Sequence, residues 1–103
     1  MKKSKENKNA SSTLNIKGEM SIYRALELKQ TLLDSVTKFE DLEVNLADVT
    51  ELDTAGIQIL MLAKRQAQET HRHFRLTAHS PAVLEVFEIL NLAAYFGDPM
   101  IIS

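Results

Sequence analysis

Alternating apolar and polar residues predict three β-strands in this chain, and a run with helical spacing follows each of them. The expected strands are residues 12–17, 44–49 and 74–78. The expected helices run from residue 21 to about 36–39, from the turn at 50–56 to about 69, and from 81 to about 90. Strands that alternate with helices predict an α/β domain with a mostly parallel sheet and right-handed crossovers.

The first and third of these helices have ordinary amphipathic patterns. In the first helix, the residues expected to face the sheet are Ile22, Ala25, Leu26, Leu32, Leu33 and Val36. The third helix has Ser80 as a suitable N-cap and Pro81 at its first position. The side chains that it is expected to bury are Val83, Val86, Phe87 and Leu90. The first helix carries no recognisable chemistry.

The middle strand, the turn after it and the second helix form the most informative stretch. Asp53 or Thr54 is the expected N-cap, because a short side-chain oxygen can accept a free amide hydrogen of the first turn. Gly56 has no Cβ, so this turn can lie close to a strand or to a partner. The stretch therefore presents a hydroxyl at the positive end of a helix, where an anion is tolerated.

The second helix has two different faces. The residues expected to face the sheet are Gly56, Ile59, Leu60, Ala63 and Ala67. On the opposite side lie Thr54, Gln58, Met61 and Arg65, with Leu62 at the edge. Because methionine and arginine are enriched in protein interfaces, this face is typical of a docking surface. The alternative is that the domain covers the helix on both sides.

Composition limits the other classes of function. The chain has 103 residues, enough for one domain with its own core, and no cysteine for disulfides or thiolate metal sites. No apolar run reaches the length of about 18 residues expected of a membrane span. Met1-Lys2-Lys3 is not followed by the apolar segment of a secretory signal. A cytoplasmic location is therefore expected.

Charge is distributed unevenly along the chain. Residues 1–10 contain four lysines and one glutamate, whereas the remainder has a formal charge of −5. Residues 1–11 are predicted to be a disordered basic tail, and residues 12–103 the folded domain. A nucleic-acid-binding arm is the alternative for the tail, but it lacks arginine and aromatic residues, and the acidic domain would repel phosphates. Nucleic acid is therefore not an expected partner.

The end of the chain is apolar. Residues 91–99 are interpreted as a turn, and Met100-Ile101-Ile102 could add an edge strand or pack on the core. Because an exposed apolar terminus favours association, we expect a monomer or a weak dimer.

Catalytic motifs are absent from the sequence, which has no GxxxxGK[ST], GxGxxG, HExxH or GxSxG pattern. His71 and His73 could supply only two metal ligands, and zinc requires three or four, so a solvated loop is predicted for them. Asp48 and Asp53 are more simply explained as residues that cap turns than as a catalytic pair. His79 could act as a general base only in hydrogen-bond contact with Thr54. We therefore predict no enzymatic activity, no cofactor and no metal.

Two turns are expected to meet in space. The Asp53-Thr54 turn and the His79-Ser80 turn both follow strands, and the carboxyl ends of parallel strands lie at one edge of the sheet. Ligands and partners of open α/β sheets bind at that edge.

These features resemble the STAS domain, the family named for sulfate transporters and anti-sigma factor antagonists. The resemblance rests on Asp53-Thr54-Ala55-Gly56-Ile57 between a strand and an apolar helix, and on His79-Ser80-Pro81 before the next helix. It implies a small α/β module with helices mainly on one side of the sheet, which binds protein partners. The partner-binding residues that this predicts are Asp53, Thr54, Gly56, Gln58, Met61, Leu62, Arg65 and Ser80.

The resemblance leaves two hypotheses about function. In bacterial signalling members of the family, a kinase-type ATPase partner related to histidine kinases phosphorylates the residue after the motif aspartate, which here is Thr54. The first hypothesis is such a phosphorylation-controlled partner of an anti-sigma factor or kinase, in stress or chemotaxis signalling. The second is a constitutive subunit that docks on the ATPase of a lipid-transport ABC system, with Thr54 as an N-cap.

Overall fold

The computed structural model describes residues 11–97. Its strands are β1 (Ser11–Met20), β2 (Asp41–Leu52) and β3 (His73–Thr77). Its helices are the short 3-10 turn η1 (Ile22–Arg24), α2 (Ala25–Lys38), α3 (Thr54–Glu69), α4 (Pro81–Leu90) and α5 (Leu92–Phe96). The predicted alternation of strands and helices is confirmed, and α5 is an additional helix where a turn was predicted.

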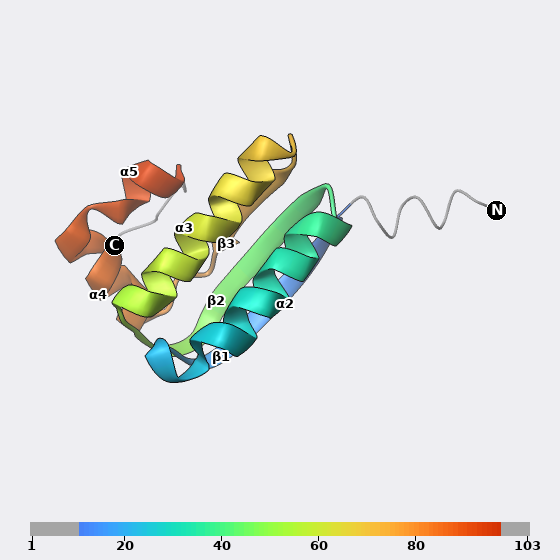
Figure 1. The fold of residues 1–103 in the computed structure, drawn as a ribbon. Coiled ribbons are helices and arrows are strands. Elements are labelled where there is room, and N and C mark those ends of the chain that lie inside the picture. The colour runs from blue at the N-terminus through green and yellow to red at the C-terminus, as the bar shows by residue number, and fades with distance from the viewer. Residues whose placement is uncertain (1–10, 98–103) are drawn as a thin grey trace.

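The three strands form one parallel sheet in the order β1-β2-β3. Figure 1 shows α2 and α3 side by side over one face of this sheet, with α4 and α5 beside α3. The predicted α/β class, with helices mainly on one side, is therefore confirmed. Parallel strands joined by crossover helices place the start of α3 and the start of α4 at the carboxyl edge of the sheet.

The central strand shows why the helices cover one face. Leu42, Val44 and Leu46 of β2 are buried and alternate with polar residues. On the other face, Arg75 of β3 pairs with Asp41 at 2.9 Å and with Glu43 at 3.4 Å. This face is therefore held by cross-strand polar contacts, whereas the first face belongs to the core.

The first strand is longer than predicted. It was expected to end at residue 17, but β1 continues through Gly18 to Met20, with irregular pairing to β2 between Gly18 and Glu19. Gly18 has a φ of +82°, a conformation that glycine adopts without strain. Because of this extension, Met20 is fully buried and its carbonyl accepts a hydrogen bond from Asp53 N at 3.1 Å. The end of β1 is thus joined directly to the start of α3.

The start of the first helix differs from the prediction. Ile22 and Leu26 were expected in the core, but they are 65% and 74% exposed, and Leu28 is buried instead. Ile22 lies in the 3-10 turn η1, outside the α-helix, and Leu26 lies about 200° around α2 from the buried Leu28. Arg24 fixes this turn by donating hydrogen bonds to the backbone carbonyls of Lys17 and Glu19.

The end of the described chain forms a small aromatic cluster. Asn91 adopts the left-handed conformation and ends α4, after which Phe96 of α5 stacks on Phe87 with ring centroids 5.4 Å apart. Leu90 was expected to be buried, but it is exposed because the chain turns away at Asn91. The predictions for residues 98–103 lie outside the described residues.

The predicted disorder of residues 1–11 also falls almost entirely outside the described residues. Only Ser11 can be compared, and it is the first residue of β1. Within residues 11–97, no helix combines the length and the apolar character needed to cross a membrane.

Candidate functional site

The start of α3 is organised by the carboxylate of Asp53. Its Oδ1 accepts a hydrogen bond from Gly56 N at 3.1 Å, which makes Asp53 the N-cap of the helix. Its Oδ2 accepts a second hydrogen bond, from Ile22 N at 3.1 Å. One side chain therefore caps α3 and ties it to η1.

These hydrogen bonds also set the charge at the site. The amide of Gly56 makes the largest contribution and lowers the pKa of Asp53 below its ordinary value, with further lowering from the amide of Ile22. Partial desolvation opposes this effect. Asp53 is therefore a carboxylate at neutral pH.

Gly56 has a structural reason to be glycine. A Cβ at this position would lie 2.9 Å from Leu52 Cδ1 and even closer to the carbonyl oxygen of Met20. The close approach that the sequence indicated is therefore to the ends of β1 and β2. Gly56 is buried, so it shapes the site without reaching its surface.

Thr54 occupies the first position of α3, and its side chain is exposed. It makes no side-chain hydrogen bond to any other residue of 11–97, because Asp53 performs the capping. The alternative in which Thr54 itself caps the helix is therefore wrong. His79 is likewise not hydrogen-bonded to Thr54; its ring lies against Phe87 at 5.3 Å.

The other predicted residues of α3 are distributed over its outer surface. Gln58 and Arg65 are exposed, whereas Met61 and Leu62 are half-buried. Met61 packs against the core, so it is less available than its position in the helical pattern predicted. Arg65 is eleven positions from Thr54 in α3, about 16 Å along the axis.

Three exposed apolar side chains lie next to this helix start, and together we call them the Ile22 patch. Ile22, Tyr23 and Leu26 are 65%, 86% and 74% exposed. The hydrogen bond between Ile22 N and Asp53 places the patch beside Thr54. The sequence predicted two of these residues, Ile22 and Leu26, in the core. The signal that could have placed them is Ser21, which accepts from Tyr23 N and thereby caps η1 rather than α2.

Ser80 does not join the surface. It is 4% exposed, and its hydroxyl accepts a hydrogen bond from Val83 N at 3.3 Å as the N-cap of α4. Its capping role is confirmed. Its predicted role in partner binding is contradicted, because the side chain is enclosed by its own domain.

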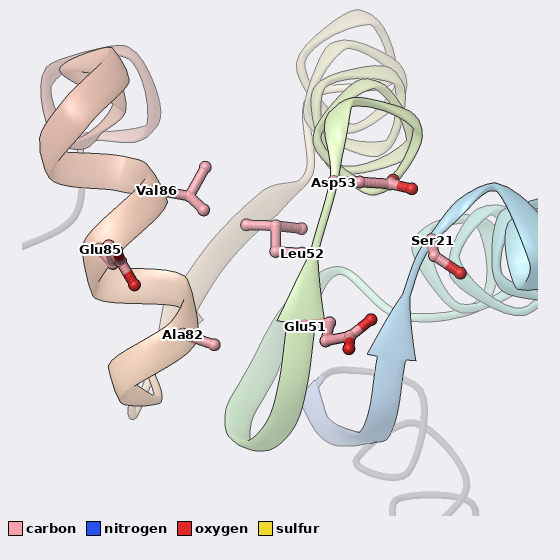
Figure 2. A pocket seen from close by; sticks show the side chains of 7 residues that line it. All are labelled: Ser21, Glu51, Leu52, Asp53, Ala82, Glu85 and Val86. Carbon is pink, nitrogen blue, oxygen red and sulfur yellow. The ribbon is translucent and has the colours of Figure 1, made fainter.

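A groove at the same edge connects the start of α3 with α4. It has a volume of about 330 Å³, and Figure 2 shows the side chains around it. The residues that line this groove are Ser21, Glu51, Leu52, Asp53, Ala82, Glu85 and Val86. Within residues 11–97, no group of three or more His, Asp or Glu side chains is arranged to hold a metal ion.

The sequence of this chain matches one family profile over almost its whole length. The profile is described as "Mlab, STAS domain", and it matches residues 4–102. This protein is a member of the STAS domain family. A search of curated proteins gives no match.

Solved structures of other STAS-type proteins have the same fold. The anti-sigma factor antagonist SpoIIAA in its unphosphorylated form superimposes with a TM-score of 0.71 at 15% identity, over 89% of this chain and 82% of SpoIIAA. Phosphorylated SpoIIAA, a cell fate determinant of Bacillus, gives 0.65 at 14% identity, over 89% and 85%. A Thermotoga maritima protein described as an anti-sigma factor antagonist gives 0.76 at 19% identity, over 89% and 80%. At these identities, the likeness establishes the STAS fold.

Proposed function

We propose that this STAS domain is a regulatory protein-binding module whose docking on a partner is controlled by phosphorylation of Thr54. The observation that carries this proposal is an exposed hydroxyl with no hydrogen bond inside residues 11–97, presented beside the exposed Ile22 patch. The module binds and does not catalyse. We place it in the cytoplasm, with an anti-sigma factor or a kinase-type ATPase related to histidine kinases as its partner, in stress or chemotaxis signalling.

The Ile22 patch supports a protein partner. Its three members are large apolar side chains within about one helical turn, in η1 and at the start of α2, and they are mostly exposed to water. Contiguous apolar surface of this kind is typical of interaction sites, because covering it removes apolar area from water. Gln58 and Arg65 on α3 add polar groups that suit the rim of such an interface.

A phosphate on Thr54 would change this surface without changing the fold. It adds a charge of about −1.5 to −2 at the N-terminus of α3, where the helix dipole tolerates it. It would stand beside the carboxylate of Asp53, and Arg24 is already held by β1 carbonyls and by Glu27. A partner that covers the site would therefore desolvate two anions, and losses of about 2–5 kcal/mol are typical of unpaired buried charges in interfaces.

The structural relatives support a switch of this kind. SpoIIAA is described in an unphosphorylated and in a phosphorylated form, and this chain superimposes on both. A phosphate is therefore compatible with the fold. By analogy, we assign the phosphoacceptor role here to Thr54.

The test compares two substitutions of Thr54 in a quantitative co-purification from the native host. Thr54→Ala should retain the partner, whereas Thr54→Glu should lose it, because only the second adds a negative charge. Thr31→Glu is the matched control, since Thr31 is an exposed threonine in α2 outside the Ile22 patch. Equal retention by both Thr54 variants would refute the switch.

The second candidate is a constitutive subunit docked on the ATPase of a lipid-transport ABC system. The observation in its favour is that the matching profile is described as Mlab rather than as an anti-sigma factor antagonist. In this case the same surface would be a permanent interface and Thr54 one of its contacts. Intact mass of the protein purified from its own cells separates the two: a phosphate increment supports the first candidate, and its absence under every growth condition supports the second.

A further inference from the structure

The groove between the start of α3 and α4 is lined by three parts of the chain. One wall is the end of β2 and the residue that follows it, with Ser21 beside them, and the other is the first two turns of α4. In Figure 2, the side chains of Leu52 and Val86 extend toward each other between β2 and α4. The interior is therefore apolar, and Ala82 continues it along α4.

The rim of this groove is acidic on both walls. Glu51, Asp53 and Glu85 are among its seven lining residues, and none of the seven is a lysine, arginine or histidine. Glu51 and Glu85 are exposed, and neither forms an ion pair or a side-chain hydrogen bond with another residue of 11–97. Asp53 already accepts two backbone hydrogen bonds, so it acts on an occupant through its charge. Glu51 and Glu85 thus both add unpaired negative charge to the rim, Glu51 on the side of β2 that faces β1 and Glu85 on α4 (Figure 2).

We propose that this groove binds a lysine or arginine side chain that a protein partner presents within an apolar segment. The aliphatic stem of such a side chain would lie on Leu52 and Val86, and its cationic head would be attracted by the negative charge of Glu51, Asp53 and Glu85. The charge of the rim selects this occupant over an apolar or acidic one. The proposal goes beyond the proposed function, since a partner can dock on Thr54 and the Ile22 patch without filling the groove.

A pair of synthetic peptides isolates the cation. The full-length ¹⁵N-labelled protein is titrated by NMR with acetyl-Leu-Arg-Leu-amide and with the same peptide containing citrulline, which has the shape of arginine without its charge. The arginine peptide should produce saturable shifts at the amides of Leu52, Glu85 and Val86, and the citrulline peptide should not. Raising the salt concentration from about 0.05 M to about 0.5 M should weaken binding, because exposed charges are screened.

Substitution of the two carboxylates tests their role. Glu51→Gln combined with Glu85→Gln should lower the affinity for the arginine peptide by about fivefold or more, as expected for exposed ion pairs. Glu88→Gln is the matched control, because Glu88 is an exposed carboxylate of α4 that does not line the groove. Thr54→Glu should leave the groove open to the peptide, so this proposal and the phosphorylation switch can fail separately.

Three results would overturn the proposal. The first is equal binding of the arginine and citrulline peptides, which would show that the groove recognises apolar surface and not positive charge. The second is an affinity unchanged in the double glutamine variant. The third is a set of nuclear Overhauser contacts between Val86 and the methyl groups of Met100, Ile101 or Ile102 in the free protein, which would show that the chain fills its own groove.

Discussion

The N-termini of α3 and α4 are built from the same local parts. Each helix follows a parallel strand, and each has an N-cap side chain that accepts a hydrogen bond from the amide three residues later. The distance is 3.1 Å from Asp53 to Gly56 N and 3.3 Å from Ser80 to Val83 N. By local structure alone, the two sites are equivalent.

Their surroundings are not equivalent. The cap of α4 is buried, and Pro81 occupies the position after it. The cap of α3 is exposed, and Thr54 occupies the corresponding position beside the Ile22 patch. The comparison teaches that an N-cap residue in the sequence predicts only where a helix begins. Whether that helix start can be an interaction site depends on its exposure and on the residues next to it in space.

The largest expected effect is on the free energy of unfolding, through the close packing of α3 against the ends of β1 and β2. Gly56→Ala places a Cβ against the carbonyl of Met20, and backbone cannot move aside as a flexible side chain can. We expect the free energy of unfolding to fall by about 3 kcal/mol, at the upper end of the costs of overpacking. Chemical denaturation with a folded-state check by circular dichroism measures this loss.

Gly97→Ala is the matched control for that substitution. A Cβ at Gly97 meets nothing within 4 Å, but the residue has a φ of +68°, so only backbone strain of about 1 kcal/mol is expected. Equal destabilisation by both alanines would show that contact with Met20 does not determine the seating of α3.

The next effect concerns binding rather than stability. Tyr23→Ala and Leu26→Ala should each weaken partner binding by about 2 kcal/mol if the Ile22 patch contains hot-spot residues. Both side chains are largely exposed, so the free energy of unfolding should change by no more than about 0.5 kcal/mol. Calorimetric titration with the purified partner, together with denaturation curves, separates these two quantities.

Ile89→Ala is the control for the patch. Ile89 is 72% exposed on α4, similar to Leu26, but it lies near the other end of that helix from its Ser80 cap. Partner binding should be unchanged. A loss equal to that of Leu26→Ala would move the interface from the start of α3 to α4.

Much of the fold could be predicted because its signals are local. Apolar periodicity and capping residues identified the order of strands and helices, the buried face of α3 and the N-cap of α4. The sequence offered both Asp53 and Thr54 as the cap of α3, and the choice depends on geometry: Asp53 reaches Gly56 N and Ile22 N together. A contact with η1 cannot be read from the turn itself.

The features that were missed depend on tertiary contacts or on short elements. Ile22 is exposed because it lies in a 3-10 turn held by Arg24, and a periodicity calculated over the whole helix does not resolve so short an element. Leu26 was assigned to the wrong face of α2, whose buried residues are Leu28, Leu32 and Val36. The five residues of α5 are too few to show a helical pattern. Glu51 and Glu85 are far apart in the sequence, and they line one acidic groove only because α4 packs beside β2.

The two caps should respond differently to loss of a hydroxyl. Ser80→Ala removes a buried cap and should cost about 1 kcal/mol of unfolding free energy while it leaves partner binding unchanged. Thr54→Ala removes an exposed hydroxyl with no hydrogen bond inside residues 11–97, so its cost should stay within about 0.5 kcal/mol. Thermal denaturation measures both. Equal costs would mean that Thr54 supports the fold, which would weaken its assignment as a free acceptor.

The smallest expected effect is on the acid sensitivity of the α3 cap. The pKa of Asp53 is lowered in the folded protein, chiefly by the hydrogen bond from Gly56 N, so its carboxylate favours folding above the ordinary aspartate pKa of 3.8. This contribution is present above that value and is lost as the pH falls below it, through the folded-state pKa.

Asp53→Asn keeps an acceptor for the cap but cannot titrate. The melting temperatures of wild type and variant should therefore converge as the pH is lowered from about 5 to about 2.5. Glu88→Gln controls for the change in net charge, and a gap that stays constant over this range would show that the carboxylate charge adds nothing to the cap.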